Sequence, residues 1–186
     1  MDVFATKGYV AASLADLTAA MGINRVSMYA TFGNKEALFV KAMVRYTQLG
    51  SQRLARCLVD GTARESFDRL VRESVRMFTD PDGHGVCFVT QGPIAQADAS
   101  AETRRFVATK RAEIESMLKG RLDAAVAEGE LAHDVSTADL ARAYAAMLQG
   151  VALQAQHGAT RAELLRVVDL AMAMWPTRRS PPRRPA

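Results

Sequence analysis

A short stretch of helical pattern, residues 25–32, lies between two turn signals, and this arrangement limits the folds available to the chain. Before the stretch, Gly22 can end one helix and Asn24 can cap the next. After it, Gly33 and Asn34 provide the same pair of signals again. Two helices joined by a short glycine-containing turn form a helix-turn-helix. The pattern therefore predicts a small helical unit near the start of the chain.

The rest of the sequence also has helical spacing, whereas β-strand signals are almost absent. Ser13 and Asp16 form a capping-box pattern at the start of the second helix, and Thr160 and Glu163 form another before the last. Pro93 should kink or end the helix around it. We expect an all-α fold with helices up to residue 7 and over 13–21, 25–32, 35–58, 63–79, 86–97, 101–128, 137–156 and 161–175.

These segments divide the chain into a small head and a larger body. Residues 1–50 are expected to form a three-helix head that contains the helix-turn-helix, continued by a long linking helix over about 35–58. Residues 51–176 are expected to form a larger helical bundle. The Pro- and Arg-rich residues 177–186 are expected to be a disordered basic tail.

Composition separates several classes of protein. Of the 186 residues, 49% are apolar and 24% are charged, which allows a packed core. The formal net charge of +4 equals the charge of the four arginines in the tail, so it says little about partners. No apolar run of membrane-spanning length and no secretion signal are present, so we expect a cytoplasmic protein without a membrane partner. The two cysteines and three histidines form no metal-ligand pattern, and no metal or cofactor is predicted.

The predicted recognition helix has two distinct faces. At 100° per residue, Met28 and Phe32 share the face that would pack inward, while Val26 and Ala30 lie opposite. Eight residues rise about 12 Å, which fits a DNA major groove about 12 Å wide. Small side chains let the backbone approach the bases, and an arginine such as Arg25 can bind guanine through two hydrogen bonds.

Hydroxyl and ammonium groups near helix N-termini suit DNA phosphates. By side-chain chemistry and place in the motif, the candidate DNA-contacting residues are Ser13, Arg25, Val26, Ser27, Tyr29, Thr31 and Lys35. No catalytic residues are predicted, because no P-loop, GxSxG or HExxH motif is present.

Residues 8–39, "GYVAASLADLTAAMGINRVSMYATFGNKEALF", resemble the DNA-binding head of the tetracycline-repressor (TetR/AcrR) family. The positions that carry the resemblance are Gly8, Tyr9, Ser13, Gly22, Tyr29, Phe32, Lys35, Glu36 and Leu38. The family's first helix is normally longer and often follows a basic arm. We therefore expect either a start further upstream or a head packed with a shortened first helix.

The resemblance implies an all-helical homodimer that binds double-stranded DNA at a palindromic operator, usually as a repressor. By this resemblance, residues 1–50 would be the DNA-binding domain with a truncated first helix, and residues 51–176 would be a helical-bundle regulatory domain for ligand binding and dimerisation. A small-molecule effector bound in the larger domain would weaken the DNA complex. By the same resemblance, Tyr29 and Lys35 would contact phosphates, and Arg25, Val26, Ser27 and Thr31 would read bases. The last two helices would pair across the dimer axis.

Side chains for the effector pocket and the dimer contact can be suggested from the apolar stripes of the body. The candidates for the ligand pocket are Phe67, Phe78, Phe88, Gln91, Met117, Tyr144 and Met147. The candidates for the dimer interface are Leu140, Leu148, Val151, Leu164, Val168 and Trp175.

Three other interpretations stay open at this point. Asp80, Asp82 and His84 are the nearest approach to an enzyme site, although a solvated turn explains them as well. A chain lacking the N-terminal arm could be a ligand-binding or protein-interaction dimer with weak or lost specific DNA binding. Cys57 or Cys87 could be a thiol sensor, or simply a buried thiol.

Overall fold

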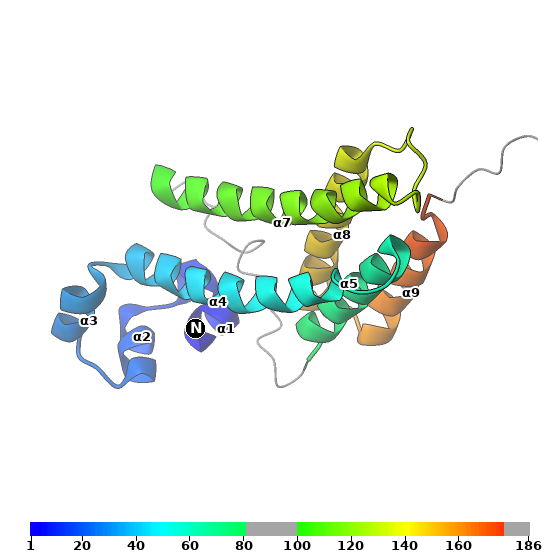
Figure 1. Cartoon of the computed structure of the whole chain (residues 1–186). Helices are drawn as coiled ribbons and strands as arrows, with labels where there is room; N and C mark the ends of the chain where they lie inside the picture. The colour runs from blue at the N-terminus through cyan, green and yellow to red at the C-terminus, as the bar shows by residue number, and fades with distance from the viewer. Residues whose placement is uncertain (81–99, 177–186) are drawn as a thin grey trace, which may run out of the picture.

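The computed structural model describes residues 1–80 and 100–176, which are largely helical and contain no strand. This confirms the predicted all-α class. The helices are α1 (Asp2–Ala11), α2 (Leu14–Met21), α3 (Arg25–Phe32), α4 (Lys35–Cys57), α5 (Ala63–Phe78), α7 (Ala101–Ala127), α8 (Thr137–Gln156) and α9 (Arg161–Ala173). Figure 1 shows α1 to α3 at one end, α5, α8 and α9 at the other, and α4 and α7 spanning between them. Several of the predictions lie outside the described residues, namely the helix expected over 86–97, the tail, and Asp82, His84, Cys87, Phe88 and Gln91.

The ends of the short helices agree with the predicted caps. Before α2, the N–H of Asp16 donates to Ser13 Oγ at 3.1 Å, and the Ser13 N–H donates back to the Asp16 carboxylate at 3.0 Å. Asn24 Oδ1 accepts the Ser27 N–H at 2.8 Å to begin α3. Gly22 has a φ of 64°, a left-handed conformation that a glycine adopts at low cost and that ends α2. The turn of the helix-turn-helix is thus determined locally.

The first helix is interrupted where the sequence predicted its end. Gly8 has a φ of 71° and a ψ of 177°, and a further helical turn follows it up to Ala11. The aromatic rings of Phe4, Tyr9 and Phe39 pack together there. The ring centroid of Phe39 lies 5.1 Å from that of Phe4 and 5.0 Å from that of Tyr9. Phe4 on α1 is therefore part of the core of the head, as is Met28 on α3.

The core of the head also contains a residue from a distant part of the chain. Val107, on the second turn of α7, is fully buried in the same cluster as Met28, Phe39 and Met43. The head is therefore completed by α7 as well as by residues 1–50.

The body has its own core around the rings of Phe67, Tyr144 and Trp175, which come from α5, α8 and the end of α9. The Phe67 centroid lies 4.7 Å from that of Tyr144 and 5.2 Å from that of Trp175. Such aromatic contacts fix how α5, α8 and α9 pack together.

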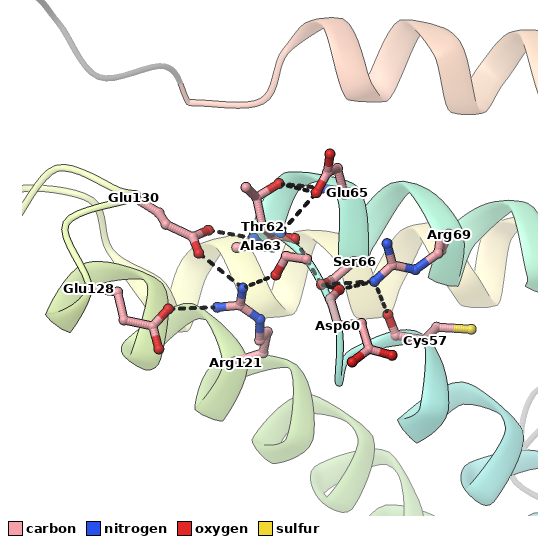
Figure 2. Close-up of polar contacts among 11 residues, drawn as sticks. Cys57, Asp60, Thr62, Ala63, Glu65, Ser66, Arg69, Arg121, Glu128 and Glu130 are labelled. Carbon is pink, nitrogen blue, oxygen red and sulfur yellow. Dashed lines mark hydrogen bonds and ion pairs between the residues drawn. The ribbon is translucent and has the colours of Figure 1, made fainter.

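Side chains of the body hold the turn between α4 and α5 (Figure 2). Arg69 donates to the backbone carbonyls of Cys57, at 3.1 Å, and of Asp60. Arg121 on α7 donates to the Gly61 carbonyl at 2.9 Å and to Glu130 at 3.2 Å. The end of α4 that is remote from the head is therefore anchored to α5 and α7.

Candidate DNA interface and ligand pocket

The recognition helix α3 presents the side chains predicted for base reading to solvent. Arg25, Val26, Tyr29 and Thr31 are exposed, and Ser27 is half-buried, while Met28 on the opposite side is fully buried. Val26 is 77% exposed, although removing an apolar side chain of this kind from water would be favourable in free energy. A surface of small and apolar groups beside one arginine has the chemistry that base edges require.

Two of the candidate phosphate contacts, Ser13 and Lys35, already have partners within the chain. Ser13 is exposed but its hydroxyl belongs to the capping box with Asp16. The Lys35 ammonium donates to the Val10 carbonyl at 3.1 Å and lies 4.8 Å from the centre of the Tyr9 ring. Partial burial lowers the pKa of Lys35. Lys35 therefore joins α4 to α1, and an ammonium has three donors, of which this bond uses one.

A second lysine beside α3 was not found from the sequence. The Lys41 ammonium donates to the Thr31 carbonyl at 3.3 Å and lies 5.2 Å from the centre of the Phe32 ring. It is exposed at the C-terminal end of the recognition helix. The only signal in the sequence was a basic residue on the helix after α3, which does not identify this contact without the fold.

A cavity of about 250 Å³ lies between α4, α5 and α7. Two of the predicted pocket residues, Phe78 and Met117, line it. Phe67 and Tyr144 are instead buried in the core of the body, and Met147 lines a separate groove along α8 and α9. The prediction missed the side chains of α4, because it placed the pocket entirely in the body.

The cavity is lined by apolar side chains with polar ones among them. Its apolar lining residues are Leu54, Met77, Phe78, Ile114 and Met117, and the ring of Tyr46 adds to them. Lys110 and Glu113 also line it and form an ion pair with each other at 2.7 Å. Gly50, in the middle of α4, leaves room because a Cβ there would meet no atom within 4 Å. The site therefore favours a small, mainly apolar molecule over an ion.

The residues predicted for the dimer interface lie mostly inside the subunit. Leu148, Val151, Leu164, Val168 and Trp175 are buried in the core of the body, and Leu140 is half-buried against it. The apolar side chains that α8 and α9 expose are others, namely Leu153, Val167, Leu170 and Met174. Within α9, Leu170 is the most exposed of these, at 69%, and Met174 lies directly after the end of the helix.

None of the helices within residues 1–80 and 100–176 is long and apolar enough to cross a bilayer. No group of three His, Cys, Asp or Glu side chains in this part of the chain is arranged to hold a metal ion. The Cys57 thiol is free, and burial raises its pKa, which makes it less reactive than an exposed thiol.

Both parts of the chain match family models. The model described as bacterial regulatory proteins, tetR family, matches residues 1–42. The model described as tetracyclin repressor-like, C-terminal domain, matches residues 61–170.

Individual relatives agree with these matches. The HTH-type transcriptional repressor ComR of Escherichia coli (strain K12) is 27% identical over 178 residues, covering 95% of this chain and 85% of ComR. The uncharacterized HTH-type transcriptional regulator YezE of Bacillus subtilis (strain 168) is 29% identical over 144 residues, covering 76% of this chain and 74% of YezE.

A solved structure extends the similarity to the fold. A cysteine mutant of the TetR family transcriptional regulator CifR, complexed with 26 bp double-strand operator DNA, is 36% identical with a TM-score of 0.84. The match covers 94% of this chain and 92% of the CifR chain. On the two family models and these relatives, the chain belongs to the TetR family of transcriptional regulators, which are DNA-binding proteins and not enzymes.

Proposed function

We propose that this protein is a ligand-responsive transcriptional repressor that binds a palindromic operator as a homodimer and is released by a small-molecule effector. The observation that carries the proposal is the exposed face of α3, where an arginine, small side chains and an uncovered valine lie together. The operator complex of CifR and the repressor name of ComR support the same function for this chain.

Within this proposal, the residues of the head have two roles. Arg25 and Val26 read base edges in the major groove, Ser27 and Thr31 lie beside them, and Tyr29 contacts a phosphate. Ser13 is assigned a phosphate at the N-terminus of α2, where backbone N–H groups favour an anion.

Two lysines near α3 have mainly structural roles. Lys35 fixes α4 against α1, and Lys41 donates to the Thr31 carbonyl in the last turn of α3. Each keeps two ammonium hydrogens that a phosphate can accept.

The exposed apolar face of α8 and α9 is the surface we assign to the dimer contact. Leu153, Val167, Leu170 and Met174 lie on it, and pairing two copies would remove all four from water. Two recognition helices about 34 Å apart would then reach successive major grooves of an inverted repeat.

The effector is inferred to be a small, uncharged and mainly apolar molecule that binds between α4, α5 and α7. The apolar lining supports this class, and Lys110 and Glu113 balance each other's charge in an ion pair. Since α4 begins directly after the recognition helix, a ligand that moves α4 would move α3. A coupling of about 1–3 kcal/mol would be enough for a modest switch, and DNA would weaken effector binding by the same factor.

The test is selection of DNA duplexes from a random library by the full chain, followed by affinity measurements on variants. Arg25→Ala should weaken binding to the selected duplex by about 1–3 kcal/mol and relax the base preference at one position in each half-site. Tyr29→Phe should lower the affinity for the selected duplex and for random duplexes by the same factor, because a phosphate contact carries no sequence information.

Arg56→Ala is the matched control, since Arg56 is an exposed arginine at the remote end of α4. Arg25→Ala and Arg56→Ala giving the same affinity would contradict the assignment of Arg25. If a folded, dimeric protein selects no duplex at all, the proposal fails and a ligand-binding or protein-interaction dimer becomes the better interpretation.

A further inference from the structure

Within residues 1–80 and 100–176, three helices are capped by an acidic residue of their own first turn. In each case the third helical residue is Asp or Glu, and its carboxylate accepts the N–H of the residue that precedes the helix. The carboxylates of Asp16 in α2, Glu65 in α5 and Glu163 in α9 lie 3.0, 2.9 and 2.8 Å from that nitrogen.

The helix α7 differs, because its third residue is Thr103, whose short side chain accepts no bond from the Ser100 N–H. A carboxylate from another domain takes that place. Glu36 Oε1, at the start of α4, accepts the Ser100 N–H at 3.1 Å and the Thr103 hydroxyl at 2.5 Å. The Ser100 hydroxyl accepts the Thr103 N–H, also at 3.1 Å. The capping box of α7 is therefore divided between the body and the head.

The surroundings suit a contact of this kind. The Thr103 side chain is buried, with only 1% of the residue exposed, so water does not readily replace Glu36. Hydrogen bonds from Ser100 and Thr103 lower the pKa of the Glu36 carboxyl, which favours its charged form at a helix N-terminus.

The same two helices connect this contact to both functional regions. Glu36 is adjacent to Lys35 at the start of α4, and the recognition helix ends at Phe32. One turn beyond Thr103, Val107 is buried in the core of the head, and one and two turns beyond Val107, Lys110 and Ile114 line the cavity. Figure 1 shows α7 running from the head, over the length of α4, to the body.

We propose that Glu36 is a positioning residue that couples the head to α7, so that the orientation of the recognition helix and the capping of α7 depend on each other. The proposal rests on the proposed DNA-binding function. Any movement of α4 relative to α7 breaks the divided capping box, whereas the boxes of α2, α5 and α9 move with their own helices.

The experiment compares the full-length protein with Glu36→Ala, Thr103→Val and the double variant. Thr103→Val keeps the shape of the buried side chain and removes only its hydroxyl. Thr103→Ser restores the hydroxyl and should restore wild-type behaviour. Glu102→Ala is the matched control, because it removes an exposed carboxylate from the same turn of α7 without touching the head.

The first readout is affinity for a DNA duplex selected by the wild-type protein. Glu36→Ala and Thr103→Val should change this affinity in the same direction and by at least threefold, and the double variant should change it no more than Glu36→Ala does. The second readout is amide hydrogen exchange in the first turn of α7. Bound DNA should alter exchange there in the wild type and much less in Thr103→Val.

Unchanged affinity in both single variants, or effects that simply add in the double variant, would overturn the proposal. Failure of the DNA-binding function itself can be recognised separately, because the wild type would then bind no selected duplex. In that case exchange without DNA decides: faster exchange at the start of α7 in Glu36→Ala than in Glu102→Ala supports the divided capping box, and equal exchange rules it out.

Discussion

Gly50 is a single residue at which helix stability and the proposed pocket conflict. It lies inside the 23-residue helix α4, where a glycine is less favourable than an alanine. A Cβ at this position would meet no atom within 4 Å, because the glycine borders the cavity. The missing side chain therefore enlarges the space available to a ligand at a cost in helix stability.

Gly50→Ala should raise the free energy of unfolding by about 0.5–1 kcal/mol, since the backbone is helical and the added methyl group has room. Chemical denaturation of the purified protein measures this. The control is Gly22→Ala, which should lower the free energy of unfolding by about 1–2 kcal/mol because φ is 64° there. A destabilised Gly50→Ala variant would show that this part of α4 is packed more closely than the cavity suggests.

Single residues of the site could be predicted from the sequence only where their partners are near in the chain. The cap of α3 by Asn24 needs a residue three positions away, so its spacing was enough. The partner of Glu36 is Ser100, which is 64 residues away and gives no periodic signal. Phe67 and Tyr144 lie in the core of the body and do not line the cavity, and an apolar pattern does not distinguish a filled core from a cavity.

At the scale of the helix, the caps explain why the bounds were predictable. The first turn of α2 shows how much chemistry one cap contains. The Asp16 carboxylate accepts hydrogen bonds from the Lys7 ammonium at 2.7 Å and from both the N–H and the hydroxyl of Ser13. These bonds join α1 to α2, the first helix of the helix-turn-helix.

The cap of α2 should be sensitive to acid. Hydrogen bonds from Lys7 and Ser13 lower the pKa of Asp16 from 3.8 to about 2. Because the folded pKa is the lower one, the stabilisation is fully present above the unfolded pKa and is lost as the pH falls from about 3.8 to 2. NMR titration of the carboxyl carbon measures the pKa directly. In Lys7→Ala it should move back toward 3.8, and an unshifted value would mean that Lys7 is not the main partner.

At the scale of the whole molecule, the sequence indicated amphipathic helices but not what covers each face. In α9, Leu164 and Val168 face the core of the body, while Leu170 and Met174 face solvent. The dimer prediction selected the inward set, because a helix with apolar residues on two sides gives one wide stripe. An apolar stripe indicates that its side chains are buried. Only the fold shows whether they are buried within the same subunit or against a second one.

The assembly should respond to a charge on the outward face. Leu170→Glu should convert a dimer into a monomer in analytical ultracentrifugation, since a carboxylate would be removed from water in the contact. Leu49→Glu is the matched control, because Leu49 is 58% exposed on α4, away from α8 and α9. Dimers of equal strength in both variants would exclude this face as the interface.

Val107 has a consequence for how such a regulator can be recombined. The buried cluster of the head is closed by this valine, which the chain supplies only in the second turn of α7. A chimaera that exchanges residues 1–50 alone would leave an unfilled space in the core of the transplanted head. It would also leave an apolar side chain of the recipient without a buried position to occupy. The head and the body are thus not separate modules in this protein, and a functional graft must carry the start of α7 with the head.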